Sequence, residues 1–261
     1  MKLLVCIKQV PADNHVEVDP ETGVLKRDGI AGKMNPYDLY ALEMALQLKD
    51  KHGASVDVLS MGPPQAKATL YEALCIGADQ AILLSDRRFA GADVLATART
   101  LVSGIQSLGQ YDLIFCGKQT TDGDTAQVGP EMAELLGINH ACYVKQLQLT
   151  PKAVTASLQM ENAVLVQELP IPCLITVEKD ANAPRLPSYR RSLEISGDEI
   201  QMLTLDDFSN RNEQYYGLSG SPTQVERIFP PPKRNEREMV IGTGAEVAER
   251  ALQVLVERKF I

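Results

Sequence analysis

The chain has 261 residues, of which 44% are hydrophobic, and this is enough for one large domain or for one domain with an appendage. A formal charge of −8 argues against nonspecific binding to nucleic acid. No stretch approaches the roughly 18 apolar residues of a membrane-spanning helix. The apolar run that opens the chain is too short for a signal peptide, so the sequence predicts a cytoplasmic protein.

The first half of the chain alternates short apolar runs with helical patterns. Buried parallel strands are expected at 3–7, 56–60, 81–84 and 113–116. Helices are expected from Asn35-Pro36 to Gly53, through Leu70 and Leu74 to Gly77, from Val94 to about Leu108, and from Glu131 to Leu136, where Gly137 stops the last of them. A small hairpin is expected within 16–25. This alternation predicts a parallel sheet with helices on both faces.

From residue 141 the pattern changes to strand-like runs at 142–149, 154–160 and 164–169, followed by another at 173–177. The links between the first three are short, which indicates antiparallel pairing. The predicted fold class is therefore α/β, a three-layer, doubly wound, mostly parallel sheet of the Rossmann-like type with an antiparallel extension.

Two polar stretches follow the strands. Residues 182–196 are expected to form a solvated loop. Residues 219–237 are extended and contain three consecutive prolines, and a helix is expected over 245–258. The boundary of the α/β domain is placed at 1–220, with an arm and helix at 221–261. Such a helix either folds back on its own domain or lies on a partner, and the sequence leaves both open.

Cysteine and histidine residues do not indicate a metal site. The five cysteines form no C-x-x-C pair, and most lie in apolar runs, as is typical of buried, reduced thiols. His15, His52 and His140 are isolated, so neither a metal centre nor a His-based triad is expected.

The polar loop at 117–130, GKQTTDGDTAQVGP, joins the fourth strand to a helix. In a doubly wound sheet, ligands bind at such a position, and the free N–H groups that open the helix favour an anion. Asp122 and Asp124 would repel a phosphate, so their expected targets are ribose hydroxyls, a flavin edge or backbone N–H groups. The alternative is a tight connection without a ligand, capped by Asp124 or Thr125.

Six segments together resemble the beta subunit of electron-transfer flavoproteins: VCIKQVP at 5–11, MNPYDLYALE at 34–43, SMGPP at 60–64, GAD at 77–79, GKQTTDGDTAQVGPEMAELLG at 117–137 and LPIPCLITVEKD at 169–180. The resemblance covers nearly the whole chain, and 117–137 is its specific part. It implies an adenine-nucleotide-binding fold that forms a heterodimer with a larger alpha subunit, which carries one FAD.

The resemblance also implies a choice of cofactor. Beta subunits of this family bind either structural AMP or a second FAD. Members with a second FAD accept electrons from NADH and bifurcate them. One electron goes to ferredoxin or flavodoxin, and the other passes through the alpha-subunit FAD to a flavin-dependent dehydrogenase, here of the acyl-CoA or 2-hydroxy-acid type.

Details within the resemblance favour the bifurcating group. Val128-Gly129 stands where AMP-type members carry T-G, and Gly123 and Thr125 stand where those members have Asn or Asp. The stretch SDRRFAGADVLAT at 85–97 also resembles the bifurcating group. FAD is therefore the expected cofactor. A non-bifurcating subunit with AMP is the alternative, and a non-redox nucleotide-binding module is a third possibility.

The resemblance implies a role for each matched residue. The adenosine site is lined by Cys6, Asn35, Pro36, Tyr37, Asp38, Ser60 and Met61. Phosphate and ribose are held in the loop formed by Gly117, Lys118, Gln119, Thr120, Thr121, Asp122, Gly123, Asp124, Thr125, Gln127, Val128 and Gly129. Asp93, Thr97 and the backbone N–H of Val94 approach the isoalloxazine. Leu186, Pro187, Tyr189 and Arg190 dock on the dehydrogenase. No catalytic acid or base is expected, because the flavin carries the chemistry of this electron-carrier subunit.

Overall fold

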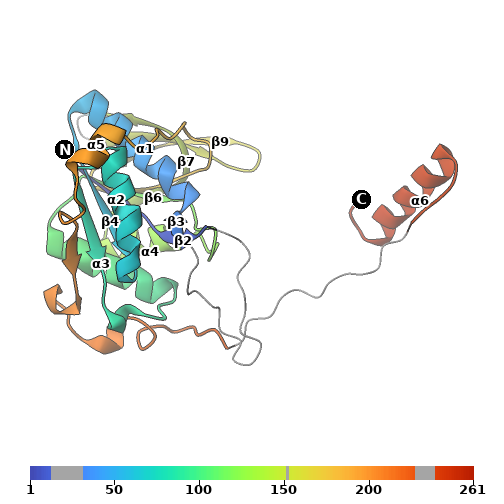
Figure 1. Ribbon diagram of the computed structural model, residues 1–261. Coiled ribbons are helices and arrows are strands. Elements are labelled where there is room, and N and C mark those ends of the chain that lie inside the picture. Colours follow the sequence, from blue (N-terminus) through green and yellow to red (C-terminus); the bar gives the residue numbers. More distant parts are fainter. Residues whose placement is uncertain (13–31, 151–152, 227–238) are drawn as a thin grey trace.

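The computed structural model describes residues 1–12, 32–150, 153–226 and 239–261. Figure 1 shows a sheet with helices on both sides and a C-terminal helix, α6 (Gly244–Glu257), that lies apart from them. The hairpin expected within 16–25 and the prolines at 230–232 lie outside the described residues. No helix in the described ranges combines the length and the apolar character that crossing a membrane requires.

The described residues form one nine-stranded sheet in the order β11, β5, β4, β1, β6, β10, β7, β8, β9. Its strands are β1 (Lys2–Cys6), β4 (Ser55–Met61), β5 (Gln80–Leu84), β6 (Leu113–Gly117), β7 (Asn139–Leu149), β8 (Ala153–Gln159), β9 (Val164–Pro170), β10 (Cys173–Val177) and β11 (Gln201–Leu203). Neighbouring strands are parallel from β11 to β7, and antiparallel from β7 to β9. A separate ribbon pairs β2 (Gln9–Pro11) with β3 (Gly32–Met34).

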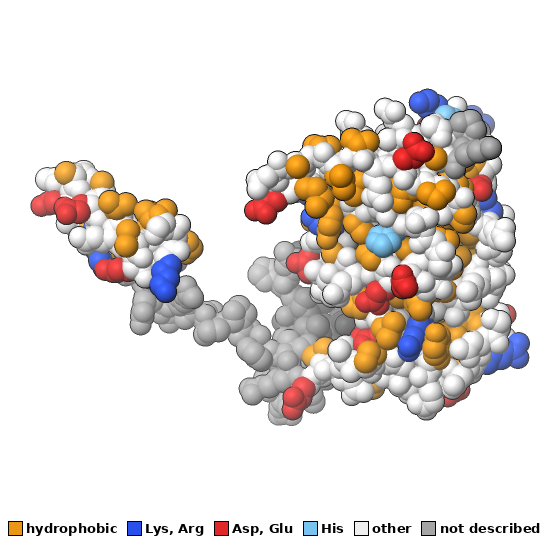
Figure 2. Space-filling view, turned by 180° about the vertical axis from the view of Figure 1, so that it is seen from behind, with side chains coloured by type: hydrophobic (Ala, Val, Ile, Leu, Met, Phe, Trp, Pro, Cys, Tyr) orange, Lys and Arg blue, Asp and Glu red, His pale blue; other side chains and the backbone are white. Residues whose placement is uncertain are grey.

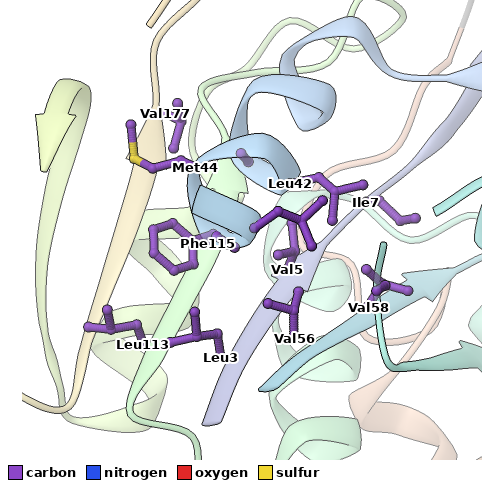
Figure 3. Packing of buried hydrophobic residues seen from close by; sticks show 14 of the residues in the cluster. Leu3, Val5, Ile7, Leu42, Met44, Val56, Val58, Leu113, Phe115 and Val177 are labelled. Carbon is purple, nitrogen blue, oxygen red and sulfur yellow. The ribbon is translucent and has the colours of Figure 1, made fainter. Parts of the chain in front are cut away.

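The helices complete three layers, which confirms the predicted fold class. They are α1 (Pro36–His52), α2 (Lys67–Ile76), α3 (Val94–Leu108), α4 (Val128–Leu136) and α5 (Tyr189–Glu194). Side chains alternate along β1 and the residue that follows it, so that Leu3, Val5 and Ile7 pack with α1 and α2, whereas Leu4 and Cys6 pack with α3 and α4. Figure 3 shows the first of these clusters, with side chains of α1 lying over neighbouring strands.

Two strands occupy places that local patterns did not predict. β10 lies between β6 and β7 and is parallel to both, although it follows β9 in the chain. All five of its residues are buried, as expected for an interior parallel strand. β11, only three residues long, adds to β5 at the edge of the sheet. The antiparallel extension of β7, β8 and β9 is confirmed.

Two predicted segments are corrected by the structure. α4 begins at Val128 rather than at Glu131, because Pro130 is compatible with the first turn, where its missing N–H costs no helical hydrogen bond. Within the loop at 182–196, residues form the short helix α5. The predicted ends at Gly53 and Gly137 are confirmed, since both adopt the left-handed conformation, with φ of 68° and 67°.

Candidate functional site

The site lies where the order of the sheet reverses. β1 lies between β4 and β6. The chain passes from β1 through α1 to β4 on one side, whereas β6 on the other side is reached only after β5 and α3. The carboxyl ends of β1 and β6 therefore flank a crevice of the kind in which open α/β sheets bind ligands. The loop at 117–127 extends from β6 at this point, as the sequence predicted.

Asp38 joins the two strand ends below the loop. Its Oδ2 accepts a hydrogen bond of 2.7 Å from the N–H of Lys8, and its Oδ1 accepts one of 3.2 Å from the N–H of Gly117. The residue is 4% exposed, and burial raises the pKa of its carboxyl to about 7 even though these hydrogen bonds act to lower it. Asp38 thus holds β1 and β6 together at the base of the crevice.

Asn35 fastens the loop to α1. It occupies the N-cap position of α1, as predicted, but its side chain does not cap the helix. Its Nδ2 donates instead to the carbonyl oxygen of Gln119 at 2.9 Å, and its Oδ1 accepts from the N–H of Thr121 at 3.2 Å. Asn35 is completely buried, so these bonds form away from competing water. They fix the first half of the loop.

The second half of the loop presents unused hydrogen-bond donors. Asp124 and Ala126 both have positive φ, 58° and 56°, which is uncommon for residues with a side chain and frequent at ligand sites. No hydrogen bond among the described residues uses the backbone N–H groups from Thr125 through Gly129. α4 also has no side-chain cap, so the cap by Asp124 or Thr125 that the alternative predicted is wrong. Successive free N–H groups at a helix N-terminus favour an anion.

The two lysines beside the crevice have different partners. Lys8 Nζ lies 2.8 Å from both carboxylate oxygens of Asp122. Lys118 Nζ turns to Glu178 at 2.9 Å and lies over the ring of Tyr143. Lys118 is among the residues predicted for the site, whereas Lys8 is not. The only local signal for Lys8 is its position directly after a buried strand.

Two glycines of the loop allow close packing. A Cβ atom on Gly117 would lie 2.4 Å from Asp38 Oδ1 and 2.7 Å from the backbone carbon of Tyr37. A Cβ atom on Gly129 would lie 2.6 Å from Thr176 Cγ2. Gly117 is therefore needed where the loop meets α1, and Gly129 where α4 meets β10.

Asp93 fastens the start of the C-terminal arm to α3. Its carboxylate accepts from the N–H of Ala96 at 3.0 Å, which caps α3, and from the N–H and hydroxyl of Thr223 at 3.0 and 2.8 Å. Its own N–H donates to Ser221 Oγ. The N-terminus of α3 is therefore covered by its own chain, whereas that of α4 is open.

Some predicted site residues lie at the crevice and others do not. Cys6 and Ser60 are buried on β1 and β4, and Ser60 Oγ has no hydrogen-bond partner in the described part of the chain. The residues predicted to dock on a dehydrogenase lie far from the crevice along the strands. Their segment contacts the C-terminal end of α2, where Ser188 N–H donates to the carbonyl oxygen of Cys75, at the amino edge of the sheet.

The fold and the loop geometry define a doubly wound α/β protein with an anion-favouring crevice at its switch point. The family described as "Electron transfer flavoprotein domain" matches residues 22–201. Electron transfer flavoprotein subunit beta of Clostridium acetobutylicum is 42% identical, and the alignment covers 100% of both chains. The caffeyl-CoA reductase-Etf complex subunit CarD of Acetobacterium woodii is 43% identical, again over 100% of both. Protein FixA of Bradyrhizobium diazoefficiens is 41% identical over 100% of this chain and 92% of its own.

The chain therefore belongs to the electron-transfer flavoprotein beta-subunit family, which confirms the resemblance found in its sequence. Beta subunits of this family pair with an alpha subunit and work with dehydrogenases. The family is associated with flavin or AMP.

Proposed function

We propose that this chain is a beta subunit that binds FAD in the crevice, accepts electrons from NADH and bifurcates them. One electron passes to ferredoxin or flavodoxin, and the other passes through the alpha-subunit FAD to a flavin-dependent dehydrogenase. The main support for a nucleotide at this position is the open N-terminus of α4, where no described residue accepts a hydrogen bond from the N–H groups of Thr125 to Gly129. The choice of FAD over AMP rests on Gly123, Thr125 and Val128 in the loop.

The residues present fit a dinucleotide. The free N–H groups at the start of α4 would hold phosphate oxygens, and Gly117 lets the loop approach α1 closely. The buried and unpartnered Ser60 Oγ at the end of β4 offers a further hydrogen bond. When bound, FAD supplies the hydride and electron chemistry, and the chain's own residues position it.

The nucleotide content of the heterodimer tests this proposal. The chain is co-expressed with its alpha subunit, purified without added flavin and denatured, and the released FAD and AMP are quantified by chromatography. We expect close to two FAD per heterodimer and no AMP, together with NADH-dependent reduction of ferredoxin when the dehydrogenase acceptor is present. One FAD and one AMP per heterodimer would contradict bifurcation and would make the chain part of a single-electron carrier.

We also propose that the C-terminal arm and α6 pack on the alpha subunit. α6 begins with a capping box between Thr243 and Glu246, and none of its residues is buried. Figure 2 shows hydrophobic side chains along one side of this helix. Val247, Leu252 and Leu255 of α6 are exposed. Isolated helices of this length are only marginally stable in water, so a covering surface is expected. We propose that the alpha subunit supplies this surface.

The docking proposal rests on a rigidly held apolar projection. Leu186 and Tyr189 are 86% and 78% exposed. Arg185 holds one end of their segment through Glu43, with hydrogen bonds of 2.8 and 3.1 Å to its carboxylate. Arg191 holds the other end by donating to two carbonyl oxygens at the end of α2. An exposed apolar group on a fixed support is a suitable anchor for a protein partner, and we propose that this partner is the dehydrogenase.

Replacement of this anchor is expected to weaken coupling to the dehydrogenase without affecting folding. In Leu186→Ala, the apparent KM for the dehydrogenase should rise about tenfold or more, because a buried leucine contributes about 1.5–3 kcal/mol to an interface. The melting temperature and the FAD content should equal those of the wild type. Leu135→Ala removes an exposed leucine from α4 and serves as the control. An unchanged KM in Leu186→Ala would reject this anchor.

A further inference from the structure

The ion pair between Lys8 and Asp122 bridges the two sides of the crevice. Lys8 follows β1, and Asp122 lies in the loop that follows β6. Both carboxylate oxygens of Asp122 accept from Lys8 Nζ at 2.8 Å. The side chains are 44% and 32% exposed, so water competes for both partners. A pair of this kind contributes little to stability and is readily exchanged for a stronger partner.

The backbone of Lys8 is fixed although its side chain is exposed. Its N–H donates to the buried carboxylate of Asp38, and its carbonyl oxygen accepts from the N–H of Asn35 at 2.9 Å. Asn35 also binds Gln119 and Thr121 of the loop. The network therefore fixes the Cα atom of Lys8 relative to the loop, while the long side chain of Lys8 can reorient at the opening of the crevice.

Of the two described lysines beside the loop, Lys8 is the one whose side chain an arriving phosphate can recruit. The segment 117–130 carries Lys118, Asp122 and Asp124. Lys118 is bound to Glu178 in a partly buried pair. Asp124 accepts a hydrogen bond from Gln119 Nε2 within the loop. The free N–H groups at the start of α4 thus favour an anion while nearby carboxylates oppose it.

We propose that Lys8 is a phosphate-binding residue of the nucleotide site, held by Asp122 when no phosphate is present. This inference rests on the proposed binding of an adenine nucleotide in the crevice. A phosphate carries up to two negative charges and three acceptor oxygens, so it competes with a single exposed carboxylate for the ammonium group. The exchange adds a cation to the site for nucleotides and none for nucleosides.

The test compares ligands that differ only in phosphate. The full-length chain, freed of bound nucleotide, is titrated calorimetrically with adenosine, AMP and ADP at low salt. For Lys8→Met we expect AMP and ADP to bind about tenfold more weakly and adenosine to bind within twofold of the wild type. For Asp122→Asn we expect the ratio of the adenosine Kd to the AMP Kd to rise, because the competing carboxylate is gone. Any contact of Asp122 with the sugar cancels in this ratio.

Lys49→Met is the matched control, because it breaks a lysine–carboxylate pair with Asp79 at the amino edge of the sheet. The ratio of the adenosine Kd to the AMP Kd in Lys49→Met should equal that of the wild type. If Lys8→Met loses the same affinity for adenosine and for AMP, or loses affinity for neither, the role of Lys8 is overturned. The proposed nucleotide site is not affected by that result. If the wild type binds neither AMP nor ADP, the role of Lys8 fails, whereas the nucleotide content of the heterodimer decides the proposed function separately. Melting temperatures of all variants separate these outcomes from misfolding.

Discussion

In the variant Gly117→Ala, the free energy of unfolding is expected to fall by about 3 kcal/mol or more, the upper range for overpacking a tightly filled site. The added methyl group would lie 2.4 Å from Asp38 Oδ1 and 2.7 Å from a backbone atom of Tyr37. Neither neighbour can turn aside, since Asp38 is held by two N–H groups and Tyr37 lies in the first turn of α1. The carboxyl end of β6 or the start of α1 must therefore shift.

Denaturant unfolding of the purified chain measures this effect. Gly123→Ala is the control for stability, because the nearest atom to its added methyl group is the hydroxyl oxygen of Thr120 at 3.3 Å. We expect a loss of stability of about 0.5 kcal/mol or less there, the usual range for surface substitutions. Equal losses in the two variants would show that Gly117 is not held between the loop and α1.

The stability of the wild type relative to Asp38→Asn is expected to fall as the pH rises from about 4 to about 7. Burial raises the pKa of the Asp38 carboxyl from 3.8 to about 7, despite its hydrogen bonds to Lys8 and Gly117. Between these values the folded protein binds a proton that the unfolded chain has released, so raising the pH favours unfolding. The full shift corresponds to about 4 kcal/mol across the window, and the difference should be level above it.

Unfolding curves at several pH values between 4 and 8 test the slope. Asparagine does not titrate, so the difference between the two proteins isolates Asp38 from the other acidic residues. The absolute stability of Asp38→Asn is expected to differ as well, because an amide offers one acceptor oxygen where the carboxyl group offers two. Glu134→Gln, which changes an exposed residue of α4, is the control variant and is compared with the wild type by the same unfolding curves. A constant difference for Asp38→Asn would contradict the raised pKa.

Local chemistry was sufficient to predict most elements of the fold. Buried parallel strands consist of continuous apolar runs, so β1, β4, β5 and β6 were visible in the sequence. Residues with fixed conformational preferences set the ends of helices, as Pro36 and Gly53 do for α1. The position of the loop after β6 followed from the order of strands and helices. The family and the expected roles of the loop residues came from the resemblance.

What could not be predicted depends on contacts between residues distant in the chain. Lys8 and Asp122 are 114 residues apart, and nothing near either residue indicates the other. Asn35 has the residue type of a helix cap, but its side chain binds the loop instead, because the fold brings Gln119 and Thr121 within reach. β11 is too short to show an alternation of apolar and polar residues, and it forms because β5 offers an open edge.

The position of β10 has a consequence for synthesis on the ribosome. β6 and β7 are made before β10, but they pair with β10 and not with each other. A nascent chain that ends before residue 173 therefore exposes the unpaired edge of β6. Its β7–β9 strands cannot join the sheet, because β10, which connects them to β6, has not been made. Such edges pair readily with the wrong strand. The emergence of a five-residue segment thus decides when the nascent sheet can close.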